Sequence, residues 1–70
     1  MSTAPLQPHQ QRVVDEKTEL DIRRAKLAAF IDGKLFLTLS EAEQIRLLRQ
    51  KIAMSRYSAI LGERIAAFEG

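Results

Sequence analysis

The stretch that decides the fold is residues 40–68, SEAEQIRLLRQKIAMSRYSAILGERIAAF. It contains no proline and a single glycine, Gly62, and its apolar residues recur with helical periodicity. Ser40 followed three residues later by Glu43 forms a capping-box pattern, in which the side chains satisfy free backbone N–H groups of the first turn. We therefore predict a helix over residues 41–68, about 42 Å long at about 1.5 Å per residue.

This helix carries two apolar stripes, each repeating at seven-residue intervals. The first contains Ile45, Ile52, Ala59 and Ala66, accompanied by Leu48, Ser55 and Gly62, and it tapers from large to small side chains. At about 100° per residue the second stripe lies on nearly the opposite side, so a single partner helix covers only one of the two. We therefore predict that another copy of the chain covers the second stripe, which contains Leu47, Met54, Leu61, Ile65 and Phe68.

A second helix is predicted ahead of this one. Residues 9–32 contain neither glycine nor proline, whereas residues 1–8 hold both prolines and are expected to be a flexible lead-in. Asp32 and Gly33 end the helix, with Gly33 expected in the left-handed conformation of a C-terminal cap, and residues 33–40 form the connector. We predict an all-α fold: an antiparallel two-helix hairpin that assembles into a helical bundle, as a homodimer or a higher oligomer.

Composition excludes several classes of function. Seventy residues suffice for one small domain, and the absence of cysteine removes disulfides and thiolate sites. The single histidine, His9, is insufficient for a metal cage, and we find no glycine-rich phosphate loop and no paired nucleophile and base. We predict no enzyme, no cofactor and no metal. No apolar run approaches the length of a membrane span and no secretory signal pattern opens the chain, so we expect a cytoplasmic protein.

Three polar side chains repeat beside the second stripe, where a coiled-coil seam normally holds leucine. They are Gln50, Tyr57 and Arg64, again at seven-residue intervals. One interpretation is that they set the register of an interface between copies. The other is a binding pocket at that interface, in which Tyr57 offers a ring face and a hydroxyl and Arg64 a forked cation.

Lys17 and Arg24 interrupt the apolar stripe of the first helix. In a hairpin that turns near Phe36, residue i faces roughly residue 72 − i, which places Lys17 opposite Ser55 and Arg24 opposite Leu48. The two cations either cover the core with their aliphatic stems or form an anion-binding pocket.

A basic band is also predicted towards the connector. The same pairing brings Arg24 alongside Arg46 and Arg49 of the second helix. This band is either a solvated surface or a site for a phosphate-bearing ligand. Long DNA is not expected as a partner, because the net charge is only +2 and no basic arm is present.

Most of the chain resembles a group of very short proteins encoded by bacteriophages and prophages. The resemblance rests on HQQRVVDEKTELD (9–21), KLAAFI (26–31), FLTLSEAEQIRLLRQ (36–50) and MSRYSAILGERIAAF (54–68). It implies a helical-hairpin accessory protein. Phage proteins of this kind include inhibitors of host proteins and oligomers that sequester the cyclic-nucleotide signals of host immunity. The tyrosine-containing N-terminal motif of known hairpin sponges is absent from this sequence.

Two functions follow as hypotheses, with a third below them. The first is a non-enzymatic counter-defence protein of the host bacterial cytosol, which sequesters a small anionic signal of cyclic-nucleotide type in a pocket between subunits. The second is an inhibitor that binds a host protein directly, of the anti-CRISPR or anti-quorum-sensing type. The third is a structural or nucleic-acid-associated helical bundle.

Overall fold

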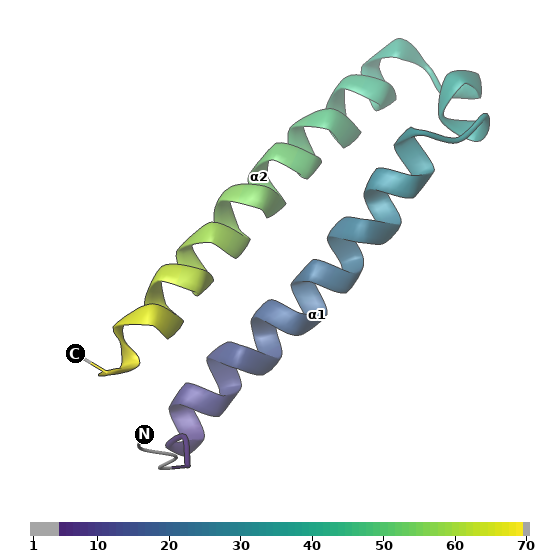
Figure 1. Ribbon diagram of the computed structural model, residues 1–70. Helices are drawn as coiled ribbons and strands as arrows, with labels where there is room; N and C mark the ends of the chain where they lie inside the picture. Colours follow the sequence, from purple (N-terminus) through teal and green to yellow (C-terminus); the bar gives the residue numbers. More distant parts are fainter. Residues whose placement is uncertain (1–4, 70) are drawn as a thin grey trace.

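The protein is a long antiparallel helical hairpin, as the sequence predicts. The computed structural model describes residues 5–69 and contains no strand within them. Helix α1 spans Pro8–Ile31 and helix α2 spans Glu41–Ala66, with short 3₁₀ turns at Leu35–Thr38 (η1) and Ala67–Glu69 (η2). Figure 1 shows the two long helices side by side, with η1 at one end and both termini at the other. The predicted all-α hairpin is thus confirmed.

Side chains fix where both helices begin. Pro8 occupies the first turn of α1, where no intrahelical N–H bond is lost, and the N–H of Gln7 donates to Oε1 of Gln10 at 2.9 Å. At the start of α2 the hydroxyl of Ser40 accepts from the N–H of Glu43 at 3.2 Å, which is the Ser40 half of the predicted capping box. The carboxylate of Glu43 pairs with Arg46 at 2.8 Å.

The end of α1 differs from the expected glycine cap. Among the described residues no glycine has a positive φ, so the prediction of a left-handed Gly33 is wrong. The N–H of Gly33 donates to the carbonyl of Phe30 at 3.1 Å. An added Cβ at Gly33 would lie 3.3 Å from that carbonyl oxygen, which is a tight contact. Glycine therefore serves a close approach of backbone to backbone here.

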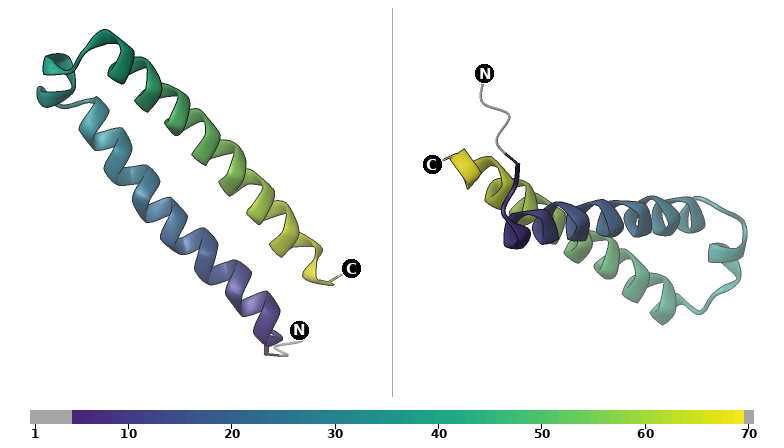
Figure 2. Two further views of the ribbon diagram at one scale, coloured as in Figure 1. Left: turned by 180° about the vertical axis from the view of Figure 1, so that it is seen from behind. Right: turned by 90° about the horizontal axis from the view of Figure 1, so that it is seen from below.

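The lead-in and the connector position the two helices. Residues 1–4 of the predicted lead-in lie outside the described residues, and Pro5 to Gln7 are not helical. In the connector Phe36 is buried. The right-hand view of Figure 2 shows that α1 and α2 cross and then diverge towards this connector. Phe36 is therefore a buried apolar side chain at the connector end of the hairpin, where the two helices are farther apart.

The apolar core lies in the half of the hairpin that holds the termini. Val13 and Leu20 of α1 are buried against Leu61 of α2, which is 0% exposed. Three partly buried side chains pack around this group: Met54 and Ile65 of α2 and Phe68 of η2.

Four residues that were predicted to contact another copy of the chain therefore pack within a single hairpin. Leu61, Met54, Ile65 and Phe68 form the contact between α1 and α2, and Leu47 is half-buried. The other stripe of α2 remains outside, with Ile45, Leu48 and Ile52 exposed. Seven-residue spacing is the same in both stripes, so spacing alone does not decide which one faces α1.

No helix within residues 5–69 is both long enough and apolar enough to cross a membrane.

Leu61 and its neighbour Ile60 offer a direct test of this packing. Leu61→Ala should lower the free energy of unfolding by about 2–5 kcal/mol, because it leaves a cavity in the core. Ile60→Ala is the matched control, since Ile60 is 55% exposed and its truncation should change stability by less than about 0.5 kcal/mol. Urea unfolding followed by circular dichroism measures both, and equal losses would contradict the packing.

Candidate functional site

A polar cluster interrupts the core halfway along the hairpin. Lys17, Asp21 and Arg24 follow one another on α1 at spacings of four and three residues, which places them on one helix face. Nζ of Lys17 lies 2.8 Å from Oδ2 of Asp21, and Nη1 of Arg24 lies 2.9 Å from Oδ1. One carboxylate thus holds two cations, each with about a third of its side chain exposed.

Two serines of α2 complete the cluster. Ser58 is 3% exposed, donates to Oδ1 of Asp21 at 2.6 Å and accepts from Lys17 at 3.1 Å and Arg24 at 3.2 Å. Ser55 accepts from Nη2 of Arg24 at 3.3 Å. In the described part of the chain, every buried side-chain nitrogen or oxygen has a hydrogen-bond partner. The network therefore joins the helices without leaving a buried polar atom unsatisfied.

The carboxylate of Asp21 is strongly stabilised in its ionised form. The hydrogen bond from Lys17, followed by those from Ser58 and Arg24, holds the pKa of Asp21 far below its ordinary value. Burial opposes this shift and is the weaker effect. Asp21 is therefore a fixed negative charge at neutral pH, and it orients both cations.

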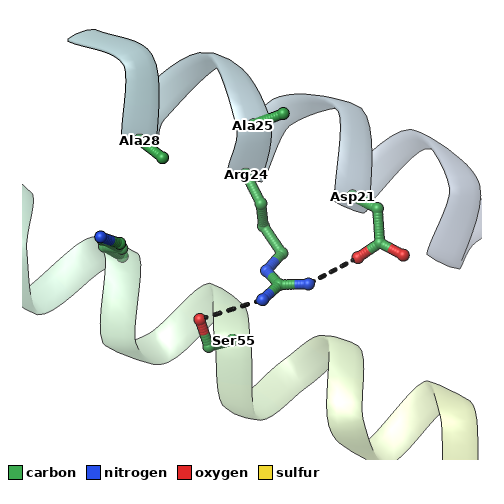
Figure 3. A pocket seen from close by; sticks show the side chains of 6 residues that line it. Asp21, Arg24, Ala25, Ala28 and Ser55 are labelled. Atoms are coloured by element: carbon green, nitrogen blue, oxygen red, sulfur yellow. Dashed lines mark hydrogen bonds and ion pairs between the residues drawn. The ribbon is translucent and has the colours of Figure 1, made fainter. Parts of the chain in front are cut away.

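A pocket opens beside this cluster. It has a volume of about 290 Å³, opens to solvent on one side, and is lined by Asp21, Arg24, Ala25, Ala28, Lys51 and Ser55. Figure 3 shows Arg24 extending from α1 to Ser55 of α2, with Ala25 and Ala28 on the adjoining surface of α1. With Lys17, which is paired to Asp21, the cluster and the pocket together hold three cations and one carboxylate. Such a surplus of positive charge beside small apolar side chains favours an anionic ligand.

The predicted cation pair is thus present, but its partners on α2 differ from the prediction. Lys17 hydrogen-bonds to Ser58, where Ser55 was predicted, and Arg24 hydrogen-bonds to Ser55 and Ser58, where Leu48 was predicted. The pairing shifts because the chain reverses later than Phe36, through η1 and on to Ser40.

The other predicted site residues lie apart from this pocket. The amide of Gln50 lies 3.8 Å from the sulfur of Met54, Tyr57 is 43% exposed, and Arg64 is exposed. Arg46 pairs with Glu43, and Arg49 points into solvent. The structure therefore brings Lys17 and Arg24 together and leaves the other five on exposed surfaces of α2.

Four polar residues of the cluster and pocket were not among the predicted site residues: Asp21, Lys51, Ser55 and Ser58. The sequence contains a pattern that could have identified Asp21, since it follows Lys17 by four residues and precedes Arg24 by three, the spacings of ion pairs on a helix. Ser58 had another, because it lies in the seven-residue series Gln44, Lys51, Ser58, Ile65, the companion of the second stripe. Within residues 5–69 no group of three His, Cys, Asp or Glu side chains is placed to hold a metal ion.

The lowered pKa of Asp21 makes an acid-dependent prediction. A carboxyl group whose pKa is lower in the folded state adds stability that is complete above the unfolded pKa, about 3.9, and is lost as the pH falls below it. Asp21→Asn should therefore lower the thermal midpoint at pH 7 and reduce its fall between pH 5 and pH 2. The control is Asp15→Asn, on the exposed surface of the same helix, which should keep the wild-type pH dependence. Identical pH profiles for both variants would contradict the role of Asp21.

Comparisons with known proteins place the chain in a family. Residues 7–67 match the family model Sequestin. An uncharacterized 7.5 kDa protein from the denB–rIIB intergenic region of Enterobacteria phage T4 is 39% identical over 61 residues, covering 87% of this chain and 95% of that protein. No solved structure matches. The predicted resemblance to small phage-encoded proteins is confirmed, and the chain belongs to the Sequestin family.

Proposed function

We propose that this protein binds and sequesters a small anionic ligand of cyclic-nucleotide type in the pocket beside Arg24 and Lys51. The observation that carries the proposal is the charge of that pocket, whose lining has two cations, Arg24 and Lys51, and one carboxylate, Asp21, which is already paired with Arg24 and with Lys17 beside the pocket. The family description supports a sequestering role in general terms. Acting in the cytosol of an infected bacterium, such a protein would withdraw an immune signal by mass action alone.

Arg24 and Lys51 have different parts in this binding. Arg24 is held by Asp21, Ser55 and Ser58, so its guanidinium is oriented before any ligand arrives. Lys51 forms no ion pair within the described residues, so its ammonium group is available to a phosphate. The oriented guanidinium of Arg24 on α1 and the free ammonium group of Lys51 on α2 suit an oxyanion that bridges the two helices.

The apolar part of the pocket suits a ring. Ala25 and Ala28 have short side chains on the α1 wall, next to the cations. Short side chains leave room for a flat group to lie against the helix while its phosphate reaches Arg24. A nucleotide combines these two features, an apolar face and an anionic group.

Binding without catalysis fits the chemistry of the cluster. Ser58 and Asp21 lie 2.6 Å apart, as a nucleophile and its base do, but Ser58 is buried. Asp21 is also a weak base, because its neighbours lower its pKa. The pair therefore joins the two helices and does not activate the hydroxyl.

A second candidate function rests on another surface of α2. Tyr57, Ile60 and Arg64 are exposed at helical spacing, with Gln50 about two turns before Tyr57. An aromatic ring, an aliphatic side chain and an arginine are a combination typical of protein-binding hot spots. This surface would serve the alternative hypothesis, direct inhibition of a host protein.

Calorimetric titration with a cyclic mononucleotide and a cyclic dinucleotide tests the first proposal. Lys51→Gln and Arg24→Gln should each weaken binding at least about tenfold, because each removes a charge-assisted hydrogen bond worth roughly 1.5–3 kcal/mol. Lys51→Gln should leave the thermal midpoint near that of the wild type, since Lys51 takes no part in the network between the helices.

Arg64→Gln is the control, because Arg64 is exposed and does not line the pocket. It should bind the nucleotide as the wild type does. If Arg64→Gln abolished binding while Lys51→Gln and Arg24→Gln had no effect, the exposed surface of Tyr57, Ile60 and Arg64 would be the nucleotide-binding site. Failure of the wild type to bind either nucleotide would count against the first proposal and favour the second.

A further inference from the structure

We propose that a second copy of this chain docks on the outer seam of α2 and closes the Arg24–Lys51 pocket. The outer seam is the set Ile45, Leu48, Ile52, Ser55, Ala59, Gly62 and Ala66. Its members alternate at spacings of three and four residues, the pattern by which one helix packs against another. It lies about a third of a turn around α2 from the core contact with α1. Ser55 and Gly62 lie on the edge of the seam that faces α1, next to Arg24 and Lys17, whereas the other five members are exposed.

The outer seam exposes apolar surface in the half near the connector, where its side chains are large. Ile45, Leu48 and Ile52 are all exposed, with Ile52 at 54%. Across the groove, Ala25 and Ala28 of α1 extend the same face with small side chains. Exposed apolar side chains of α2 thus lie close in sequence to the pocket residues Lys51 and Ser55, and exposed apolar surface of this kind is typical of an interface.

The taper of the seam makes it complementary to itself. Large side chains occupy the half near the connector, and Ala59, Gly62 and Ala66 occupy the half near the C-terminal end. If two copies pack α2 against α2 in antiparallel fashion, the large half of each meets the small half of the other. A two-fold axis passing near Ser55 produces this match, because Ser55 lies at the middle of the seam.

Gly62 supplies an independent argument for a close neighbour. A glycine within a helix lowers helix stability relative to alanine. A Cβ added at Gly62 would meet only Cε of Lys17, at 3.5 Å, which is an ordinary contact. The hairpin itself therefore tolerates a side chain at this position. A second helix packed against the seam would require glycine here, because the missing side chain lets the two backbones approach closely.

The surface area of the single chain agrees with a missing partner. The hairpin exposes 5682 Å², whereas a compact monomer of 7.9 kDa exposes about 4,400 Å². Its radius of gyration is 16.0 Å, against about 11 Å for a compact chain of this length. A standard interface buries about 800 Å² per partner, which fits within this excess.

Docking around Ser55 also completes the pocket, and this step rests on the proposed function. The pocket is partly open to solvent and has Ser55, a member of the outer seam, and Lys51 in its wall. A two-fold axis near Ser55 would bring the two pockets together, each with its own Arg24 and Lys51. The joined site would suit a ligand with two anionic groups related by approximate symmetry, such as a nucleotide with two phosphates.

Ile52 and Ile60 provide a matched pair of variants for the test. Both are isoleucines of α2 with nearly equal exposure, 54% and 55%, but Ile60 lies about a third of a turn beyond the outer seam. In sedimentation equilibrium the wild type should be a dimer at micromolar concentration. Ile52→Asp should weaken self-association at least about 100-fold, whereas Ile60→Asp should leave it unchanged. A monomeric wild type, or the reverse pattern of the two variants, would overturn the proposal.

A crosslinking variant keeps the test informative if Ile52→Asp fails to fold. The chain has no cysteine, so Ser55→Cys introduces one thiol at the proposed axis. Under mild oxidation it should form a disulfide between two chains rapidly and nearly completely. The control, Ile60→Cys, should crosslink slowly, and equal rates would contradict the predicted axis.

Gly62→Ala adds a readout that a free surface would not show. It should raise the concentration needed for dimer formation, although alanine favours the helix. If the seam has no partner, Gly62→Ala raises the thermal midpoint and leaves association unchanged. Nucleotide titration separates the two proposals: a dimer that binds no nucleotide contradicts only the proposed function. Wild-type affinity in a folded, monomeric Ile52→Asp contradicts only the closure of the pocket.

Discussion

The structure depends on the carboxylate of Asp21, which holds Lys17 and Arg24 in the contact between the helices and binds Ser58 across it. Removing charged groups from water is costly, so they are tolerated at a helix contact only when each is paired or hydrogen-bonded. Here the network meets that condition and fixes the register of α2 against α1. The apolar core is accordingly confined to the terminal half of the hairpin.

The same network links stability to the candidate site. Arg24 serves both, since it bonds Asp21 and the two serines while it lines the pocket. Lys51 lines the pocket from α2 without joining the network. Folding therefore orients one cation in advance and leaves a second free, an arrangement that reduces the entropy lost when an anion binds.

Much of the fold was predictable from local patterns, whereas the face of α2 that packs on α1 was not. The Ser40 cap and the lack of helix breakers in residues 9–32 establish the two helices. Lys17 and Arg24 were predictable as a pair because they interrupt an apolar stripe. Two stripes with the same seven-residue repeat are equivalent until a partner is known, so the pairing of Leu61 with α1 required the three-dimensional contact. Ser58 was not predicted, because its seven-residue series, Gln44, Lys51, Ser58 and Ile65, is mostly polar and therefore does not indicate burial.

Native mass spectrometry of the protein, purified from bacteria with active nucleotide-based immune signalling, tests the central claim most directly. The claim is that two hairpins enclose an anionic ligand between their Arg24–Lys51 pockets. It predicts a complex of two chains with added mass that is released as a nucleotide on denaturation, and no such mass in Lys51→Gln. A ligand-bearing single chain, or a dimer without bound nucleotide, would contradict the claim.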